Sequence, residues 1–333
     1  MKAEPEGAVE NAIVLAAGYG ERLKPLSLVR PKPLVPLLNR PLLDWVLDYL
    51  FSSGIRSAAV NAHHLWECIR DYTNRSLRDR ADVTLIHEPV ILGTGGGIKN
   101  CARHLAGDGP FLVMNADVVT DLDLGAMASS HVRSGAPATL ALHDLPRFNS
   151  VSVSGDRITA FAGRSTAGVK DSRLLAFTGI HLIERDLLAD IPEGKVDIIS
   201  VYRTLIDRGA PIHAFISSDL YWEDLGSLDD YRRVHKELLC GRRRPKFNMA
   251  PGRGLTFPYG KTWPQNGVTF EGWACVGQDA VLGRGCHIAD SLLWNGVRVD
   301  AGVQIRDCIV TDGATVSRDI SGRNLIHWNC AKR

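Results

Sequence analysis

The sequence predicts an α/β domain with a mainly parallel sheet, followed by a short parallel β-helix. Short apolar runs alternate with helical patterns through the first 240 residues, as is typical of βαβ units. Glycine, proline and arginine then accumulate from Cys240 to Gly254, and this composition indicates a linker. A six-residue period begins at Val276, which is typical of the stacked turns of a parallel β-helix.

Apolar runs in the first part of the chain predict buried strands, and helical spacing at 41–53 and 65–72 predicts helices between them. Ligands of such sheets bind at the carboxyl ends of the strands. We therefore expect the segments 61–63 and 115–117 to lie at the binding edge. The expected strands are 12–17, 57–61, 83–87, 111–114, 138–142 and 176–182.

The first strand breaks at once into Gly18 and Gly20, which let backbone N–H groups approach an anion closely. Arg22 stands near the place where a dinucleotide-binding loop has its third glycine, and the segment 95–100 lacks the Gly-Lys-Ser/Thr ending of a P-loop. Arg22 can donate a forked pair of hydrogen bonds to triphosphate oxygens, and Lys32 supplies a second charge. The sequence therefore predicts a polyphosphate-binding loop of another kind.

The chain has 333 residues, 45% of them apolar, which is enough for two domains. Its formal net charge of +2 provides no general field for nucleic acid or for an anionic membrane. Residues 1–7 lack the apolar core of a signal peptide, and no apolar run has the length of a membrane span. Seven cysteines without a Cys-x-x-Cys pair predict reduced, mostly buried thiols and a cytoplasmic protein.

The C-terminal period divides the chain into a first domain at 1–240, a linker at 241–260 and a hexapeptide-repeat domain at 261–333. The repeats give about two to three turns of about eighteen residues each. So short a solenoid needs capping by the preceding domain or by another subunit, and we expect a homo-oligomer. The hexads start at Val276, Leu282 and Ile288, and after a five-residue shift at Val299, Ile305 and Thr311.

The run Leu15-Ala-Ala-Gly-x-Gly-x-Arg22, followed by Pro31-Lys32-Pro33, resembles the signature of sugar-1-phosphate nucleotidyltransferases. With the hexad repeats, the chain looks most like mannose-1-phosphate guanylyltransferases that carry a C-terminal left-handed β-helix. The resemblance implies a Rossmann-like nucleotidyltransferase domain that joins a nucleoside triphosphate to a sugar 1-phosphate and releases pyrophosphate.

The resemblance also implies roles for individual residues. Arg22 would hold the β- and γ-phosphates, Lys32 the transferring phosphate, and Asp117 with Asp224 one Mg²⁺ ion. Two carboxylates and substrate phosphates are a common magnesium ligand set. The residues implied in nucleotide binding are Ala16, Ala17, Gly18, Tyr19, Gly20, Glu21, Arg22, Glu88, Gly93 and Thr94.

Glu88 bears on the choice of base. A carboxylate accepts hydrogen bonds, and guanine offers more donors than uracil, so Glu88 in a base-reading position would favour GTP. Glu88 could instead cap a loop, and the Gly95–Gly97 run also resembles uridylyltransferases that act on N-acetylmuramate 1-phosphate. GTP with a mannose-like 1-phosphate is therefore the first expectation, and UTP with a hexose or amino-sugar 1-phosphate the second.

Contacts with the sugar are implied for Thr178, Gly179, Asn149 and Trp222. The Glu-Lys-Pro motif of many members is replaced by Phe161-Ala-Gly-Arg-Ser165, which leaves the identity of the sugar open.

Two other classes of function remain. A non-catalytic regulatory subunit of the same architecture would be expected to lose a metal carboxylate or a loop cation, and the chain keeps Arg22, Lys32, Asp117 and Asp224. An acyltransferase would need more turns and a long inserted loop in the hexad region. We therefore expect that region to serve assembly or lid support.

Overall fold

The computed structural model describes residues 9–77, 82–161, 172–247, 249–257 and 267–327. Its contacts divide the chain into two compact units. Unit 1 comprises Met1–Gly18 and Val46–Trp222, and unit 2 comprises Tyr19–Trp45 and Glu223–Arg333. This division differs from the predicted boundaries at 240 and 260, because the segment that carries Arg22 and Lys32 groups with the C-terminal part of the chain.

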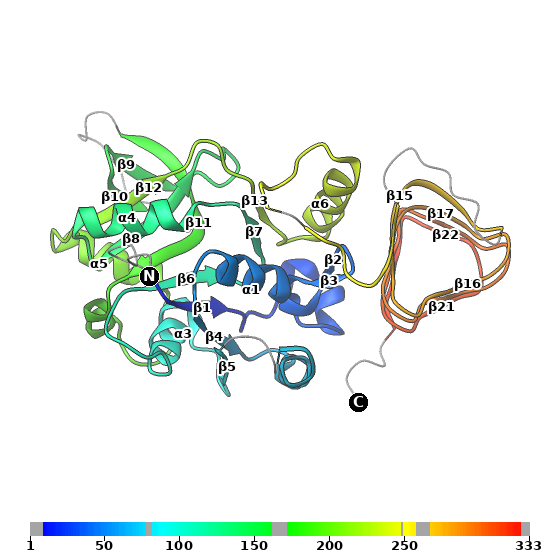
Figure 1. Cartoon of the computed structure of the whole chain (residues 1–333), viewed down its shortest axis with the longest axis horizontal. Coiled ribbons are helices and arrows are strands. Elements are labelled where there is room, and N and C mark those ends of the chain that lie inside the picture. Colours follow the sequence, from blue (N-terminus) through cyan, green and yellow to red (C-terminus); the bar gives the residue numbers. More distant parts are fainter. Residues whose placement is uncertain (1–8, 78–81, 162–171, 248, 258–266, 328–333) are drawn as a thin grey trace, which may run out of the picture. The chain divides into compact units, whose positions relative to one another are not determined.

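Unit 1 is built on a nine-stranded sheet in the order β5-β4-β1-β6-β11-β8-β12-β10-β9 (Figure 1). All six expected strands are confirmed within a few residues at each end. The strands are β1 (Asn11–Leu15), β4 (Ser57–Ala62), β5 (Asp82–His87), β6 (Phe111–Asn115), β8 (Ala138–His143), β9 (Val151–Ser154), β10 (Arg157–Phe161), β11 (Arg173–Ile183) and β12 (Ile212–Ile216).

The sheet is mixed, so the expectation of a mainly parallel sheet holds for one half only. Strands β5, β4, β1 and β6 are parallel. Strand β11 then runs antiparallel to both β6 and β8, while β12 is parallel to β8. Strands β9 and β10 form a hairpin whose turn contains Gly155 at φ 61°. The apolar composition of β11 signals burial, but it does not encode the direction of the strand.

In the described residues the α-helices are α1 and α2, which were expected, and four others. Asp123, Asp197 and Ser227 accept hydrogen bonds from backbone N–H groups at the start of α4, α5 and α6 and so cap them. The helices are α1 (Leu42–Ser52), α2 (Trp66–Tyr72), α3 (Gly93–Ala102), α4 (Leu124–Ser134), α5 (Ile198–Asp207) and α6 (Leu228–Cys240).

Strand order reverses at β1 and creates a binding edge in unit 1. The chain runs outward from β1 through β4 to β5 and then returns to β6 on the other side of β1. The backbone N–H of Ala116, just after β6, donates to the carbonyl of Leu15 at 3.0 Å. The segments 16–18 and 116–117 therefore leave neighbouring strand ends, as expected for a ligand site at a topological switch point.

In unit 2 the C-terminal strands form a parallel coil, drawn in orange to red in Figure 1. Val281 lies opposite Arg298, and Arg298 lies opposite Thr315, so these turns advance by 17 residues, whereas the last turn advances by 15, from Ile305 to Ile320. The five-residue shift in the hexad pattern explains the 17-residue repeat. The stacked strands are β15 (Thr269–Gly277), β16 (Val281–Leu282), β17 (His287–Leu293), β18 (Arg298–Val299), β19 (Gln304–Arg306), β20 (Ile309–Val310), β21 (Thr315–Val316), β22 (Ile320–Ser321) and β23 (Asn324–Leu325).

The coil also reaches further toward the N-terminus than the hexads indicate. Strand β14 (Gly254–Phe257) pairs antiparallel with β15, so part of the expected linker at 241–260 belongs to this sheet. The apolar hexad residues Val276, Ile288, Val299 and Ile305 are buried in one hydrophobic core of the coil.

The remaining segments of unit 2 and the strand at the division are short. They comprise the 3-10 turns Glu21–Leu23, Leu26–Leu28 and Lys32–Leu34, with β2 (Pro36–Leu37), β3 (Arg40–Pro41) and β13 (Trp222–Asp224). None of the helices in the described ranges has the length and apolarity needed to cross a bilayer. The six described cysteines carry free thiols, and four of them are buried, while Cys330 lies outside the described residues.

Two buried histidines make the fold sensitive to acid. Burial lowers the pKa of His181 to about 3 and that of His235 to about 4. The backbone N–H of Leu38 donates to Nε2 of His235 at 3.1 Å, so Nδ1 carries the proton and donates to the carbonyl of Tyr231. An unfolded histidine titrates near pH 6.5. Between pH 6.5 and 4 the unfolded chain therefore binds protons that the folded chain excludes.

We predict that the free energy of unfolding decreases as the pH falls from 6.5 toward 4. His235 alone contributes up to about 3 kcal/mol to this loss, at about 1.4 kcal/mol per pKa unit. Urea unfolding of wild type and His235→Gln at pH 7, 6 and 5 measures the effect. The variant should be less stable at pH 7 and should show a shallower dependence on pH. Parallel curves for the two proteins would contradict the assignment.

Candidate active site

The loop predicted to bind polyphosphate turns sharply at Gly20. This residue has φ 65° and precedes the 3-10 turn Glu21–Leu23. A Cβ atom at Gly20 would lie 3.0 Å from Cβ of Ser27, so both the backbone conformation and the space favour glycine. The turn leaves the side chain of Arg22 60% exposed, while Glu21 pairs with Lys24. Arg22 is therefore accessible to a ligand.

Arg22 and Lys32 both pair with Asp224. Nη2 of Arg22 lies 3.2 Å from Oδ2 of Asp224, and Nζ of Lys32 lies 3.5 Å from Oδ1. Lys32 and Asp224 are largely buried, with 12% and 16% of their side chains exposed. A Cβ atom at Gly226 would lie 2.5 Å from Nη2 of Arg22, so glycine makes room for the guanidinium. Three of the four predicted catalytic residues thus form one cluster in unit 2.

A buried ion pair holds the strand that carries Asp224. The carboxylate of Glu223 accepts hydrogen bonds from Nη1 and Nη2 of Arg233 at 3.2 and 2.6 Å. It accepts a third from Nη1 of Arg243 at 2.9 Å. Only 5% of the Glu223 side chain is exposed, and these contacts raise the pKa of Arg233 above its usual value. A carboxylate in that position needs such partners to offset its desolvation. The predicted site residues did not include Glu223, which directly precedes Asp224.

In unit 1 a chain of hydrogen bonds links the end of β1 to the start of α3. The N–H of Ala16 donates to Oδ1 of Asn61 at 2.7 Å, and Nδ2 of Asn61 donates to Oε1 of Glu88 at 2.7 Å. Oε2 of Glu88 accepts from the N–H of Leu92 at 3.0 Å. Glu88 is 1% exposed, so both carboxylate oxygens serve the protein itself. Of the two readings of Glu88, this geometry favours the loop cap.

Gly93 and Thr94, which the resemblance implies in nucleotide binding, begin the first turn of α3. A Cβ atom would lie 2.6 Å from the carbonyl oxygen of Val196 at Gly93, and 2.2 Å from that of Gly194 at Gly96. The glycines therefore let α3 pack closely on the segment before α5. Oγ1 of Thr94 donates to Asp197 at 3.0 Å and accepts from the N–H of Ile198 at 2.9 Å.

The structure brings together three of the four residues predicted to contact the sugar. Nε1 of Trp222 donates to the carbonyl of Thr178 at 2.9 Å. Gly179 has φ 77°, and a Cβ atom there would lie 2.6 Å from Nδ2 of Asn115. Asn149 instead bonds within its own turn, where its amide contacts Leu145 N and Asp144. Asn115, at the end of β6, is a neighbour that the predicted set lacked.

Asp117 follows β6 in unit 1, whereas Asp224 belongs to unit 2. Across the described part of the chain, no three His, Cys, Asp or Glu side chains gather to hold a metal ion. The metal-ligating atoms beside Arg22 and Lys32 are the carboxylate oxygens of Asp224. Oxygen ligands suit Mg²⁺ when a substrate supplies the remaining ligands.

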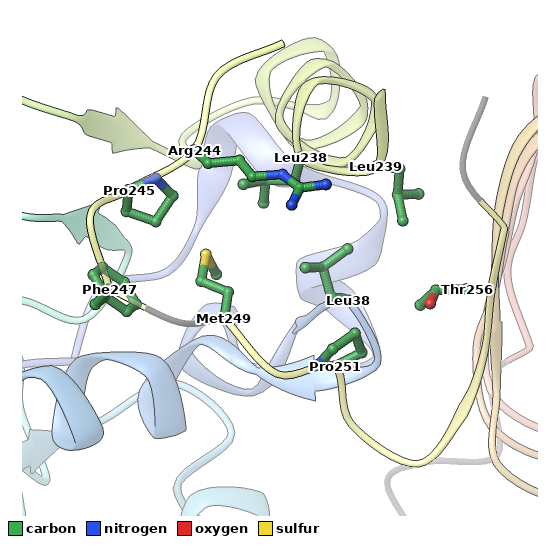
Figure 2. Close-up of a pocket in the computed structure, with 9 residues that line it drawn as sticks. All are labelled: Leu38, Leu238, Leu239, Arg244, Pro245, Phe247, Met249, Pro251 and Thr256. Carbon is green, nitrogen blue, oxygen red and sulfur yellow. The ribbon is translucent and has the colours of Figure 1, made fainter. Parts of the chain in front are cut away.

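Unit 2 also contains a cavity of about 360 Å³, whose lining differs from the charged cluster around Asp224 (Figure 2). Its lining is largely apolar, with one guanidinium and no carboxylate, so it does not suit a magnesium triphosphate. The lining residues are Leu38, Leu238, Leu239, Arg244, Pro245, Phe247, Met249, Pro251 and Thr256.

Comparison with known proteins agrees with the loop and strand-end geometry. The sequence pattern of the family described as "Nucleotidyl transferase" matches residues 11–150. The chain is 29% identical to a mannose-1-phosphate guanylyltransferase of Mycobacterium tuberculosis, over 89% of this chain and 82% of that protein. It is 25% identical to a UTP–glucose-1-phosphate uridylyltransferase of Synechocystis, over 90% of this chain and 87% of that protein.

A third relative is the D-glycero-alpha-D-manno-heptose 1-phosphate guanylyltransferase of Aneurinibacillus thermoaerophilus. The two sequences are 30% identical over 68% of this chain and 98% of that protein. All three relatives carry names of sugar-1-phosphate nucleotidyltransferases, although their bases and sugars differ. With its signature loop intact and the cations of that loop gathered on Asp224, the chain belongs to the sugar-1-phosphate nucleotidyltransferase family.

Proposed function

We propose that the protein transfers a guanylyl group from GTP to a mannose-like 1-phosphate and releases pyrophosphate. The observation that carries this proposal is the convergence of Arg22 and Lys32 on Asp224. Two cations, one in the 3-10 turn after Gly20 and one in the 3-10 turn Lys32–Leu34, suit a polyphosphate when they converge. The guanylyltransferases among the relatives, which act on mannose or manno-heptose 1-phosphate, support the choice of GTP and of a mannose-like sugar.

The reaction would be an in-line displacement at the α-phosphorus. An oxygen of the sugar phosphate attacks that phosphorus, the bond to the bridging oxygen of the β-phosphate breaks, and pyrophosphate leaves with the electron pair. The attacking oxygen is already anionic, so no side chain has to remove a proton. Catalysis then consists of positioning and charge stabilisation, which Arg22 supplies at the β- and γ-phosphates and Lys32 at the transferring phosphate.

Asp117 and Asp224 would hold one Mg²⁺ ion, which would neutralise phosphate charge when bound. Asp117 and Asp224 belong to different units, so the support for this pairing comes from the family resemblance. Asp224 already balances two cations, and a triphosphate offers the same cations competing oxygens. Binding of the nucleotide would therefore release the carboxylate for the metal.

The choice of base rests on the relatives and not on Glu88. Both oxygens of that carboxylate bond within the chain, so Glu88 would act by holding Ala16 and the start of α3 in place. Gly93 and Thr94 would then present backbone to the nucleotide from a fixed helix start. The uridylyltransferase relative supports the second candidate, a UTP enzyme acting on a hexose or amino-sugar 1-phosphate.

The proposal extends to the remaining parts of the chain. Thr178, Gly179 and Trp222 would contact the sugar, with Asn149 in the neighbouring turn. The stacked strands with their 17-residue repeat support a left-handed β-helix of hexapeptide repeats. We also propose a homo-oligomer, and the free thiols support a cytoplasmic location.

Pyrophosphate release from a matrix of nucleoside triphosphates and sugar 1-phosphates tests the function. We expect the highest kcat/KM with GTP and mannose 1-phosphate, loss of activity with EDTA and recovery with Mg²⁺. A maximum with UTP would favour the second candidate. Binding of a nucleotide sugar without turnover of any pair would overturn the proposal in favour of a regulatory subunit.

Arg22→Ala should lower kcat/KM by roughly 10²-fold with every nucleotide, because the contact is to the phosphates that all of them share. Arg208→Ala is a matched control, since Arg208 is a similarly exposed arginine that pairs with Asp190 at 3.0 Å. The control should retain wild-type activity. A loss confined to one base would assign Arg22 to base recognition.

Glu88→Gln should lower stability by about 1–3 kcal/mol without changing the preference for a base. A glutamine amide cannot accept from both Asn61 and Leu92, so one buried donor loses its partner. Thermal unfolding and the ratio of kcat/KM for GTP and UTP measure the two effects. A shift of that ratio toward UTP by tenfold or more would restore Glu88 as a base-reading residue.

A further inference from the structure

The segment before Lys32 is tied to the C-terminal coil through Arg30. The guanidinium of Arg30 forms an ion pair with Oδ2 of Asp312 and lies over the Trp294 ring, 4.8 Å from its centroid. Only 18% of the Arg30 side chain and 22% of the Asp312 side chain is exposed. Oδ1 of Asp312 also accepts from the N–H of Asn295 at 3.1 Å, which fixes the carboxylate on the coil. Such a partly buried, doubly held pair is worth more than a solvated one.

The segment after Lys32 is tied to the same part of the coil. Nε1 of Trp294 donates to the hydroxyl of Tyr231 at 3.2 Å, and that hydroxyl donates to the carbonyl of Pro36 at 2.6 Å. Trp294 and Tyr231 are 3% and 1% exposed. In this relay every buried polar group has a partner, so its geometry is well determined.

The hairpin that follows is strained and needs external support. Leu38 and Asn39 have φ of 51° and 62°, and a leucine in the left-handed region costs on the order of 1–3 kcal/mol. The carbonyl of Leu38 accepts from Gly252 N at 2.9 Å, and Nδ2 of Asn39 donates to the carbonyl of Val276 at 3.0 Å. The residues before and within the coil thus hold the conformation of this turn.

We propose that the C-terminal coil positions Lys32 in the active site, with Arg30, Tyr231, Trp294 and Asp312 as positioning residues. Lys32 lies between the two tethers, at the start of a single 3-10 turn. A displacement of about 1 Å in a group that orients a reacting phosphate can cost 10²-fold in rate. The inference rests on the proposed function, and it gives the coil a role beyond assembly or lid support.

Asp312→Asn tests the tether. The asparagine keeps an oxygen for Asn295 N–H but removes the charge that binds Arg30. Asp307→Asn is the matched control, because Asp307 lies on the same coil and pairs with Arg232 of α6 at 3.1 Å. Asp307 has φ 50°, a conformation that asparagine also tolerates. Both substitutions therefore remove one coil carboxylate from one ion pair with an arginine.

We expect Asp312→Asn to lower kcat at least tenfold with KM for the sugar 1-phosphate within threefold of wild type, whereas Asp307→Asn keeps the wild-type kcat. The melting temperature of Asp312→Asn should lie below that of Asp307→Asn, because the Arg30–Asp312 pair is the more buried of the two, but both variants should remain folded at the assay temperature. In an Arg30→Gln background, Asp312→Asn should cause no further loss, because the two side chains act as one contact. Equal kcat for the two single variants, or fully additive losses in the double variant, would overturn the inference.

Amide hydrogen exchange separates this inference from the proposed function. If wild type turns over no pair in the substrate matrix, the proposed function fails, but the tether can still be measured. Exchange across residues 19–37 should be faster in Asp312→Asn than in wild type and in Asp307→Asn. Identical exchange in all three proteins would overturn the positioning role.

Discussion

Asp224 carries the charge that allows Arg22 and Lys32 to lie close to each other. Two cations in neighbouring positions repel, and burial of Lys32 would disfavour its charge without a carboxylate nearby. Arg22 is 202 residues away from Asp224 in sequence, so the cluster forms only when β13 is in place. Glu223, bound by Arg233 and Arg243, fixes that strand from its other side, and Gly226 leaves space for the guanidinium. The polyphosphate loop therefore depends on a distant strand for its shape.

In unit 1 the edge of the sheet at the carboxyl ends of β1 and β6 is organised by close backbone approach. Asn61 reaches Ala16 on one side and Glu88 on the other, and a side chain at Gly97 would lie 2.7 Å from its Nδ2 atom. Gly93 and Gly96 similarly bring α3 against the segment before α5. Glycines and buried polar bridges take the place of bulky side chains at this edge, which leaves the backbone open to the proposed nucleotide. The glycine run thus reflects packing of a helix, and Glu88 reflects the need to fix the loop that leads into it.

Local patterns in the sequence predicted much of this architecture. Alternating apolar runs predicted six strands, and the glycines before Arg22 predicted the turn that the structure has at Gly20, because burial and positive φ leave clear local signals. The direction of a strand and the partners of a side chain leave no such local signal, since they depend on contacts between distant residues. The antiparallel β11, the buried partners of Glu88 and the pairing of Arg30 with Asp312 have no local signature. The 17-residue repeat was visible as a shift in the hexads, but the strand at Gly254–Phe257 lacks that period.

The segment from Tyr19 to Pro41 shows why the C-terminal part of the chain matters to the site. It contains three single 3-10 turns and a two-residue hairpin, so few of its backbone hydrogen bonds are internal to a regular element. Ordering each such residue costs about 1–2 kcal/mol in backbone entropy, whereas a net hydrogen bond returns about 1 kcal/mol. Local bonds alone therefore cannot hold Lys32 in one place. The buried relay through Tyr231 and Trp294 and the ion pair of Arg30 supply contacts of the kind that can, and they come from α6 and the coil.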